Sequence, residues 1–320
     1  MMKKIKELLQ DLTASDIIVI GFGLFLSLLN LIFLFKIEGW YVNILINFGF
    51  TAFIFALAYM HKATGKMFWE QFHYWYLVPT IFFSFKEVGY MIRYIHNGAD
   101  YDRFLIAIDR FIFFGNDPTH LLYHIANPFL TEILQVAYST FFFLPVIMGI
   151  DLILNKRIKE LTYGTFIIVY GFFLSYLGYF LWPGIGPRFT LHEFANTSKE
   201  LPGLFIADFL REFLNAGEGI PAGTLNPAAV VQRDVFPSGH TQMTLLTMYL
   251  AYKFNIKSRR FIIPVGILLI FATVYLRYHY FVDLLGGAVF MVLTLITGHF
   301  IYNKWAKYKK EEPFDWRSFK

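Results

Sequence analysis

Two short segments of the sequence carry side chains that could handle a phosphate group. The first reads Phe-Pro-Ser-Gly-His-Thr at 236–241. Pro suits the first turn of a helix, and Ser238 and Gly239 leave free N–H groups at its positive end. Such an end binds phosphate, to which His240 could donate a proton. The segment equally fits a capped helix with an interfacial histidine.

The second segment reads Arg277-Tyr-His279-Tyr-Phe-Val-Asp283 and is followed by Gly286 and Gly287. His279 and Asp283 are four residues apart, so they share a helix face. A carboxylate beside an imidazole fixes its tautomer and leaves the other ring nitrogen as a nucleophile or base. The plainer alternative is a structural salt link between Arg277 and Asp283.

Three further cations are candidates for holding phosphate oxygens. Arg188 follows a Pro-Gly-Ile-Gly-Pro bend, and its guanidinium can hold two oxygens at once, unless it only reaches toward lipid headgroups. Lys86 and Arg93 lie seven residues apart and form a secondary candidate. We instead favour ion pairing of these two residues with Glu87, Asp102 or Asp109.

The elements that position these residues are predicted to be membrane helices. The chain is 57% hydrophobic and 16% charged, whereas soluble domains carry roughly 25% charged residues. Its long apolar runs predict an all-α polytopic membrane helix bundle. The eight expected spans are 17–35, 41–60, 74–95, 129–150, 160–182, 238–254, 261–281 and 283–302. The absence of cysteine excludes disulfides and cysteine metal sites, and no acidic cluster suits Mg²⁺, so we expect no cofactor or metal.

The basic residues predict the orientation of these spans. An eight-span arrangement puts 18 of the 28 Lys and Arg residues on one side, which we assign to the cytoplasm together with both termini. The connections 96–128 and 183–237 then lie outside. The first contains an amphipathic interfacial helix and a Gly-Asn-Asp-Pro turn, and the second a short helix near 202–214. His240 and His279 are expected on this same outer side.

At this point the residues resemble the type 2 phosphatidic acid phosphatase superfamily. Pro-Ser-Gly-His at 237–240 matches its middle motif, and His279-x-x-x-Asp283 with Gly-Gly matches the end of its last motif. Two features depart from the pattern. Thr273 stands where an Arg is usual, and Gly-Pro-Arg at 186–188 replaces Lys, six residues and Arg-Pro. Lys86 and Arg93 have that spacing two spans too early, which we interpret as coincidence.

Several segments of the chain, including the Gly-Pro-Arg departure, resemble one branch of the superfamily. Pro-Gly-Ile-Gly-Pro-Arg-Phe at 183–189, the 237–240 motif and the segment 275–283 are similar to the inositolphosphotransferase-type subgroup, which includes the fungal inositol phosphorylceramide synthase and its bacterial relatives. The segment 109–118 also resembles that branch. The resemblance implies a six-helix core within 129–303, preceded by N-terminal helices and an amphipathic outer loop at 1–128. A basic cytoplasmic tail at 304–320 would follow the core.

The resemblance also implies a mechanism. His279 would attack the phosphorus of a membrane lipid, Asp283 would orient it, and His240 would protonate the leaving oxygen. Arg188, Arg277, Ser238 and Gly239 would hold the phosphoryl oxygens. A lipid hydroxyl or water would complete the reaction, giving a phosphotransferase or a phosphatase acting on phosphatidate-like or polyprenyl substrates. A transporter or scaffold is the third class. We expect an integral protein of the bacterial inner membrane with an extracytoplasmic site and no nucleic-acid partner.

Overall fold

The structure, a computed structural model, describes residues 9–316, and within that range it contains helices and connections but no β-strand. The longer helices are α2 (Ala14–Ile32), α3 (Trp40–Thr64), α4 (Met67–Trp75), α5 (Leu77–His96), α6 (Asp102–Ile112), α8 (Pro128–Ser139), α9 (Phe143–Leu154), α10 (Ile158–Leu181), α13 (Ala207–Gly217), α15 (Gly239–Lys253), α16 (Arg259–Tyr275) and α17 (Phe281–Lys309). The short ones are α7 (Pro118–Tyr123), α11 (Pro187–Thr190), η1 (Phe194–Asn196), α12 (Thr197–Glu200) and α14 (Pro227–Val230). The predicted all-α membrane bundle is confirmed.

A helix is present at each of the eight predicted spans, but their ability to cross a membrane differs. By length and composition, α2, α3, α10 and α17 could each span a bilayer. The predicted span 129–150 is two helices, α8 and α9, bent by 55° and together apolar enough to count as a fifth. Helices α5, α15 and α16 do not meet the same test, and α15 has only 15 residues. Length and composition therefore support four or five of the eight spans.

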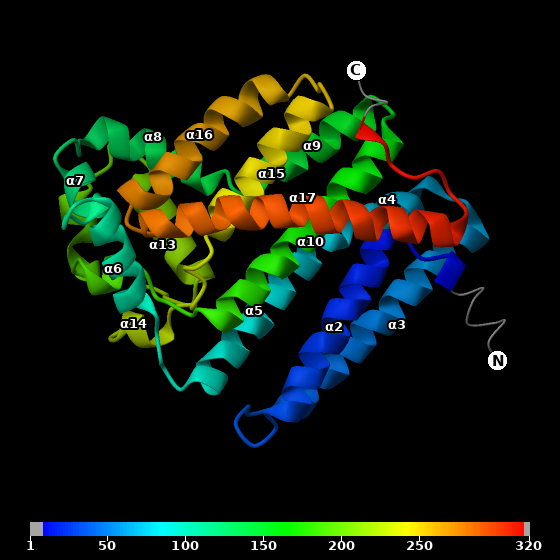
Figure 1. The fold of residues 1–320 in the computed structure, drawn as a ribbon, viewed down its shortest axis with the longest axis horizontal. Coiled ribbons are helices and arrows are strands. Elements are labelled where there is room, and N and C mark those ends of the chain that lie inside the picture. Colours follow the sequence, from blue (N-terminus) through cyan, green and yellow to red (C-terminus); the bar gives the residue numbers. More distant parts are fainter. Residues whose placement is uncertain (1–8, 317–320) are drawn as a thin grey trace.

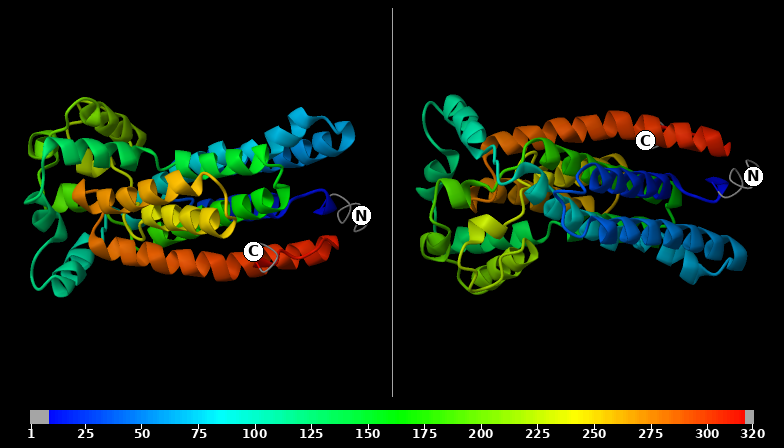
Figure 2. Two further views of the ribbon diagram at one scale, coloured as in Figure 1. Left: turned by 90° about the horizontal axis from the view of Figure 1, so that it is seen from above. Right: turned by 90° about the horizontal axis from the view of Figure 1, so that it is seen from below.

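The helices run between two ends of an elongated molecule (Figures 1 and 2). Helices α6, α7, α13 and α14 gather at one end, where α17 also begins, while α4 and the end of α17 lie at the other. The predicted amphipathic helix is α6, and the predicted short helix near 202–214 is α13, shifted by a few residues. The two long connections therefore meet at one end of the bundle.

Close approach between α10, α15 and α17 shapes that end of the bundle. A side chain at Gly239 would collide with the hydroxyl of Tyr179 on α10. A Cβ at Gly287 on α17 would lie 2.7 Å from the carbonyl oxygen of Ser238. Glycine at these two positions lets three helices converge where α15 begins.

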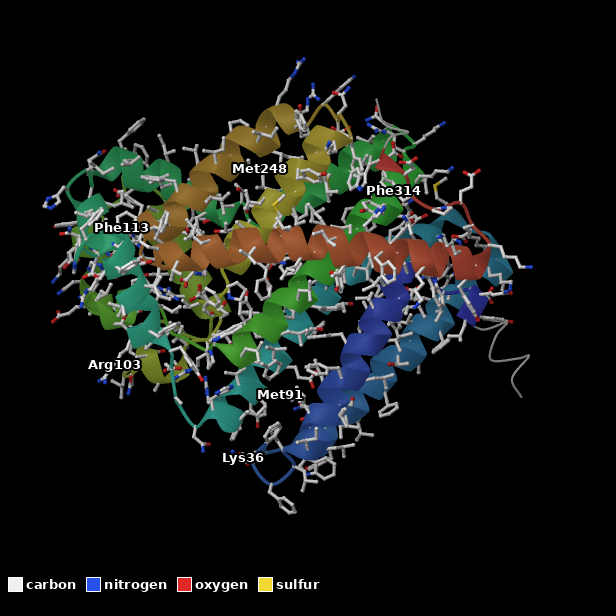
Figure 3. The ribbon with its side chains drawn as sticks, viewed as in Figure 1. Lys36, Met91, Arg103, Phe113, Met248 and Phe314 are labelled. Carbon is white, nitrogen blue, oxygen red and sulfur yellow. The ribbon has the colours of Figure 1, made fainter. Side chains whose placement is uncertain are left out.

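The opposite end is closed by the last described residues. Phe314 stacks on Tyr163 of α10 with ring centroids 3.7 Å apart, and its N–H donates to Asn303 at 2.7 Å (Figure 3). The segment expected to be a basic tail thus packs against the bundle as far as the structure describes it. Five basic residues used for the orientation, Lys3, Lys4, Lys6, Arg317 and Lys320, lie outside the described residues. The division of the chain into domains stays a prediction.

Candidate active site

His279 lies in the short connection between α16 and α17, and both of its ring nitrogens are engaged. Its Nδ1–H donates to the carbonyl oxygen of Val235 at 3.0 Å, and Nδ1 is 3.4 Å from a carboxylate oxygen of Asp283. A carbonyl can only accept, so the proton of the neutral ring sits on Nδ1 and Nε2 keeps its lone pair. Burial lowers the pKa of His279 to about 3, which keeps the ring neutral at pH 7.

His240 occupies the first turn of α15 and faces His279 directly. Its Nδ1 lies 3.3 Å from His279 Nε2 and 3.5 Å from the hydroxyl of Tyr138. The ring stacks on Tyr138 at 4.6 Å between centroids and contacts Phe141 at 4.2 Å. The structure therefore brings together the two predicted histidines, from segments 39 residues apart.

Arg188 reaches the same place from the bend after α10. A pocket with about 250 Å³ of empty volume is lined by Arg188, His240 and His279, together with Tyr138, Ile185, Glu218, Asp234, Val235 and Tyr278. The guanidinium stacks on the ring of Tyr278 at 4.6 Å and donates to Asn215 at 2.9 Å. It also forms an ion pair with Glu218, while its buried Nε–H has no acceptor among the described residues. The Nε–H of Arg188 is therefore a donor that a bound ligand could use.

The family comparison agrees with this geometry. A family model described as the PAP2 superfamily matches residues 103–297, which is more than half of the chain. The chain belongs to the PAP2 superfamily. Searches of curated proteins and of solved structures returned no match. PAP2 membership indicates phosphatase- or phosphotransferase-type chemistry on lipid phosphates and confirms the resemblance at the level of the superfamily.

The PAP2 match begins at residue 103, inside α6, and α6 carries two buried carboxylates that hold the site together. Asp102 accepts the N–H of Ile185 at 3.0 Å, the N–H of Gly186 at 2.8 Å and the hydroxyl of Tyr280 at 2.7 Å. Ile185 and Gly186 precede Arg188, and Tyr280 follows His279. Asp102 therefore links the loop that carries Arg188 to the loop that carries His279.

Asp109 lies seven residues further along the same face of α6 and fixes the start of α17. Its two oxygens accept the N–H groups of Phe281 and Val282, each at 2.8 Å. Asp283 accepts the N–H of Tyr280 at 2.7 Å, so these two carboxylates satisfy the free donors of this helix end. The sequence analysis named both aspartates as possible partners for Lys86 and Arg93, and Asp109 also as the first residue of the segment 109–118. The signal for their real role is a seven-residue spacing on an otherwise apolar helix face.

Two predicted phosphate ligands of the PAP2 motif have structural partners. The Ser238 hydroxyl accepts the N–H of Thr241 at 3.2 Å as the N-cap of α15, and Ser238 is fully buried. Gly239 is the first residue of α15 and packs against Tyr179. Neither residue lines the pocket. Both shape the turn that carries His240.

Arg277 points away from the pocket. Its guanidinium forms an ion pair with Glu200 and lies 5.5 Å from the ring centroid of Tyr123. The alternative, a salt link to Asp283, is not formed, because the Arg277 guanidinium pairs with Glu200. The Arg277 carbonyl accepts the Arg188 N–H at 3.1 Å, so its backbone supports the loop of Arg188. The structure thus brings Arg188 to the histidines and keeps Arg277 apart.

Lys86 and Arg93 contact the connection 183–237 rather than carboxylates. Lys86 donates to the carbonyl of Gly217, and Arg93 donates to the carbonyl of Val230 at 2.6 Å. The favoured pairing with Glu87, Asp102 or Asp109 is wrong. Glu87 instead accepts from the amides of Asn30 and Asn47, at 3.1 and 3.0 Å. Neither cation lines the pocket. Their hydrogen bonds to backbone carbonyls instead hold the segment between α13 and α15 in place.

Two acidic residues line the pocket and were missed by sequence reasoning. Glu218 pairs with Arg188, and Asp234 lies three residues before Pro237. Burial raises the pKa of Asp234, while Arg188 and Lys86 act against that shift. No described side chain donates a hydrogen bond to the Asp234 carboxylate. No spacing rule in the sequence marks either residue.

Proposed function

We propose that the chain is a lipid phosphotransferase of the membrane. It uses His279 to move a phosphorylated headgroup, of the inositol phosphate type, from one lipid to the hydroxyl of another. One observation carries this proposal. The Nε2 lone pair of His279 points at His240 across 3.3 Å, in a pocket that Arg188 lines. An oriented imidazole, a second imidazole for proton transfer and a guanidinium are the groups that metal-free phosphoryl transfer through histidine requires.

The first half-reaction forms a phosphohistidine. Nε2 of His279 attacks phosphorus and forms a P–N bond, while the P–O bond to the leaving lipid alkoxide breaks. His240 gives that oxygen a proton, because the charge of a bound phosphate favours the protonated imidazole. Asp283, beside Nδ1 at 3.4 Å, offsets the positive charge that develops on the His279 ring. The guanidinium of Arg188 holds the phosphoryl oxygens.

The second half-reaction reverses the proton flow. The acceptor hydroxyl gives its proton to the now neutral His240 and attacks phosphorus. The P–N bond breaks, and His279 regains its lone pair. Water in place of the alcohol would give the alternative activity, a lipid phosphate phosphatase acting on phosphatidate-like or polyprenyl substrates.

The acidic wall of the pocket suits a substrate or acceptor that carries hydroxyl groups. Asp234 is a carboxylate in a site for phosphate, which is unfavourable unless a ligand brings a hydrogen-bond donor to it. A hydroxyl of the acceptor or of the headgroup supplies such a donor. The sequence similarity to the inositolphosphotransferase branch points the same way.

The decisive assay supplies phosphatidylinositol labelled in its phosphate, with or without an acceptor, which is either ceramide or a diacylglycerol whose acyl chains differ from those of the donor. Labelled product that forms only with an acceptor supports transfer. Water-soluble labelled product that forms regardless of the acceptor supports hydrolysis. Solute transport into sealed vesicles, without either product, would favour the transporter class and contradict the proposal.

Substitution of Asp234 by Asn should slow transfer selectively. The change keeps the size of the side chain but removes the charge that holds a hydroxyl, and a hydrogen bond of this kind is worth about tenfold in rate. We expect kcat/KM for the acceptor to fall about tenfold, while the rate of phosphohistidine formation stays within about twofold. An equal loss in both steps would show that Asp234 has no role specific to the hydroxyl.

Substitution of Glu218 by Gln should strengthen phosphate binding. The Glu218 carboxylate now pairs with the guanidinium that the substrate phosphate needs, so the two anions compete for Arg188. We expect the inhibition constant of inorganic phosphate to fall by about three- to tenfold, the size of one partly buried charge contact. The control is Asn215→Ala, which removes a neutral partner of the same guanidinium and should not tighten binding. Unchanged phosphate affinity in Glu218→Gln would contradict the competition.

A further inference from the structure

A second cavity lies between α5, α9 and α10, away from the phosphate pocket. The space between its walls has an empty volume of about 750 Å³, which includes the part that opens to the surroundings. Its walls include Val78 and Ile81 of α5, Val146 and Met148 of α9, and Val169 and Phe172 of α10. No charged side chain of the described residues lines it. Its chemistry suits a hydrocarbon chain.

The near end of this cavity lies at the depth of the tail of a lipid held at the phosphate pocket. Helix α10 provides the scale, because Tyr179 lies beside Gly239 at the start of α15. Phe172 is seven residues deeper, or roughly 10 Å, and Leu161 at the far end of the cavity is roughly 16 Å deeper still. The hydrocarbon core of a bilayer is about 30 Å thick, so the cavity extends past its middle.

A single phenylalanine, Phe141, lies between side chains of the phosphate pocket and side chains of the cavity. The helix breaks between α8 and α9 with a bend of 55°, and Phe141 and Phe142 lie at this break. The Phe141 ring is 4.2 Å from the His240 ring and 6.0 Å from that of Phe172. Phe142 and Phe172, which line the cavity, are 6.4 Å apart. One aromatic ring therefore separates His240 from the wall of the cavity.

We propose that the α5–α9–α10 cavity binds one hydrocarbon chain of the lipid whose phosphate lies at Arg188 and His279. The proposal rests on the proposed function and adds where the lipid tail goes. A lipid tail is as apolar in the bilayer as in the cavity, so the cavity gains little from hydrophobic transfer. What it provides is position: a chain held along Phe142 and Phe172 places its headgroup near His279. The cavity then selects substrates by chain length.

The test fills the cavity and compares chain lengths. Val146→Trp places an indole in the cavity, and the control Ile150→Trp places one on the same helix at a residue that is 44% exposed and outside the cavity wall. With dioleoyl phosphatidylinositol we expect Val146→Trp to lose about tenfold or more in kcat/KM, and with the dihexanoyl lipid to stay within about twofold of wild type. Equal losses with both lipids would overturn the proposal.

A binding measurement keeps the proposal independent of turnover. A long-chain phosphatidate with a diazirine near the end of one acyl chain is photolysed with the full-length protein in nanodiscs. We expect adducts on α9 and α10 in wild type and in Ile150→Trp, and their loss in Val146→Trp. Adducts spread over lipid-facing helices such as α3, and unaffected by Val146→Trp, would overturn the cavity proposal. Absence of turnover with both lipids, with these adducts present, would overturn only the proposed function.

Discussion

Replacement of His279 by alanine is expected to abolish turnover, with a fall in kcat of at least about 10⁴-fold, because the covalent route to product disappears. The His279 ring is buried and contacts Val235 and Asp283, and these contacts are lost in the variant. The backbone N–H of residue 279 donates to the Thr273 carbonyl at 3.0 Å, and this hydrogen bond is kept. The measurement is product formation in the acceptor assay, together with trapping of labelled phosphoprotein after a short incubation. Both signals should vanish together.

Two variants make this result specific. His192→Ala removes a histidine of the connection 183–237 that bonds Thr119 at 2.8 Å and does not line the pocket. The activity of this variant should match wild type. His240→Ala should slow both half-reactions but still allow some phosphoprotein to accumulate from a substrate with a good leaving group, since the nucleophile remains. Full activity in His279→Ala would refute the mechanism, whatever the behaviour of the other two.

The sequence predicted the helices better than their bends. Long apolar runs define the bundle, because only helices satisfy their own backbone in a membrane. The predicted span 129–150 nonetheless breaks between α8 and α9. Pro145 gives the reason: it lacks the N–H that would bond the carbonyl of Phe141, so the helix cannot continue through this point. The proline was visible in the sequence, but the cavity beside the break depends on α5 and α10, which no local pattern reveals.

The candidate site divides in the same way. His240, His279 and Asp283 could be found because each belongs to a short motif at a helix end. The partners of the arginines could not be found, because Arg188 pairs with Glu218 and Arg277 with Glu200 across folded connections. Two arginines that were both predicted to hold phosphate thus have different surroundings. The path of the segment 183–237 decides which guanidinium meets the histidines.

The second large effect is expected from Asp102, which touches none of the reacting groups in the proposed mechanism. Asp102→Asn replaces one acceptor oxygen by an amide donor, although the carboxylate now serves the N–H groups of Ile185 and Gly186 and the hydroxyl of Tyr280. The loop of Arg188 should then separate from the loop of His279. Because a displacement of about 1 Å can cost roughly a hundredfold in rate, we expect kcat to fall by about that factor. The fall in kcat is measured by acceptor assays of the variant, with the rate divided by the amount of folded protein.

A control must separate positioning from general loss of stability. Asp151 plays a comparable part at the opposite end of the bundle, where it accepts the N–H of Ser258 at 2.7 Å just before α16. Asp151→Asn should lower the thermal midpoint but leave kcat per folded molecule unchanged. Asp102→Asn should lower kcat per folded molecule and also weaken phosphate binding, since Arg188 moves with its loop. If both variants lose activity only in proportion to unfolded protein, Asp102 is a structural residue alone. A loss confined to Asp102→Asn would mean that α6, an amphipathic helix outside the motifs, sets the distance between the cation and the nucleophile.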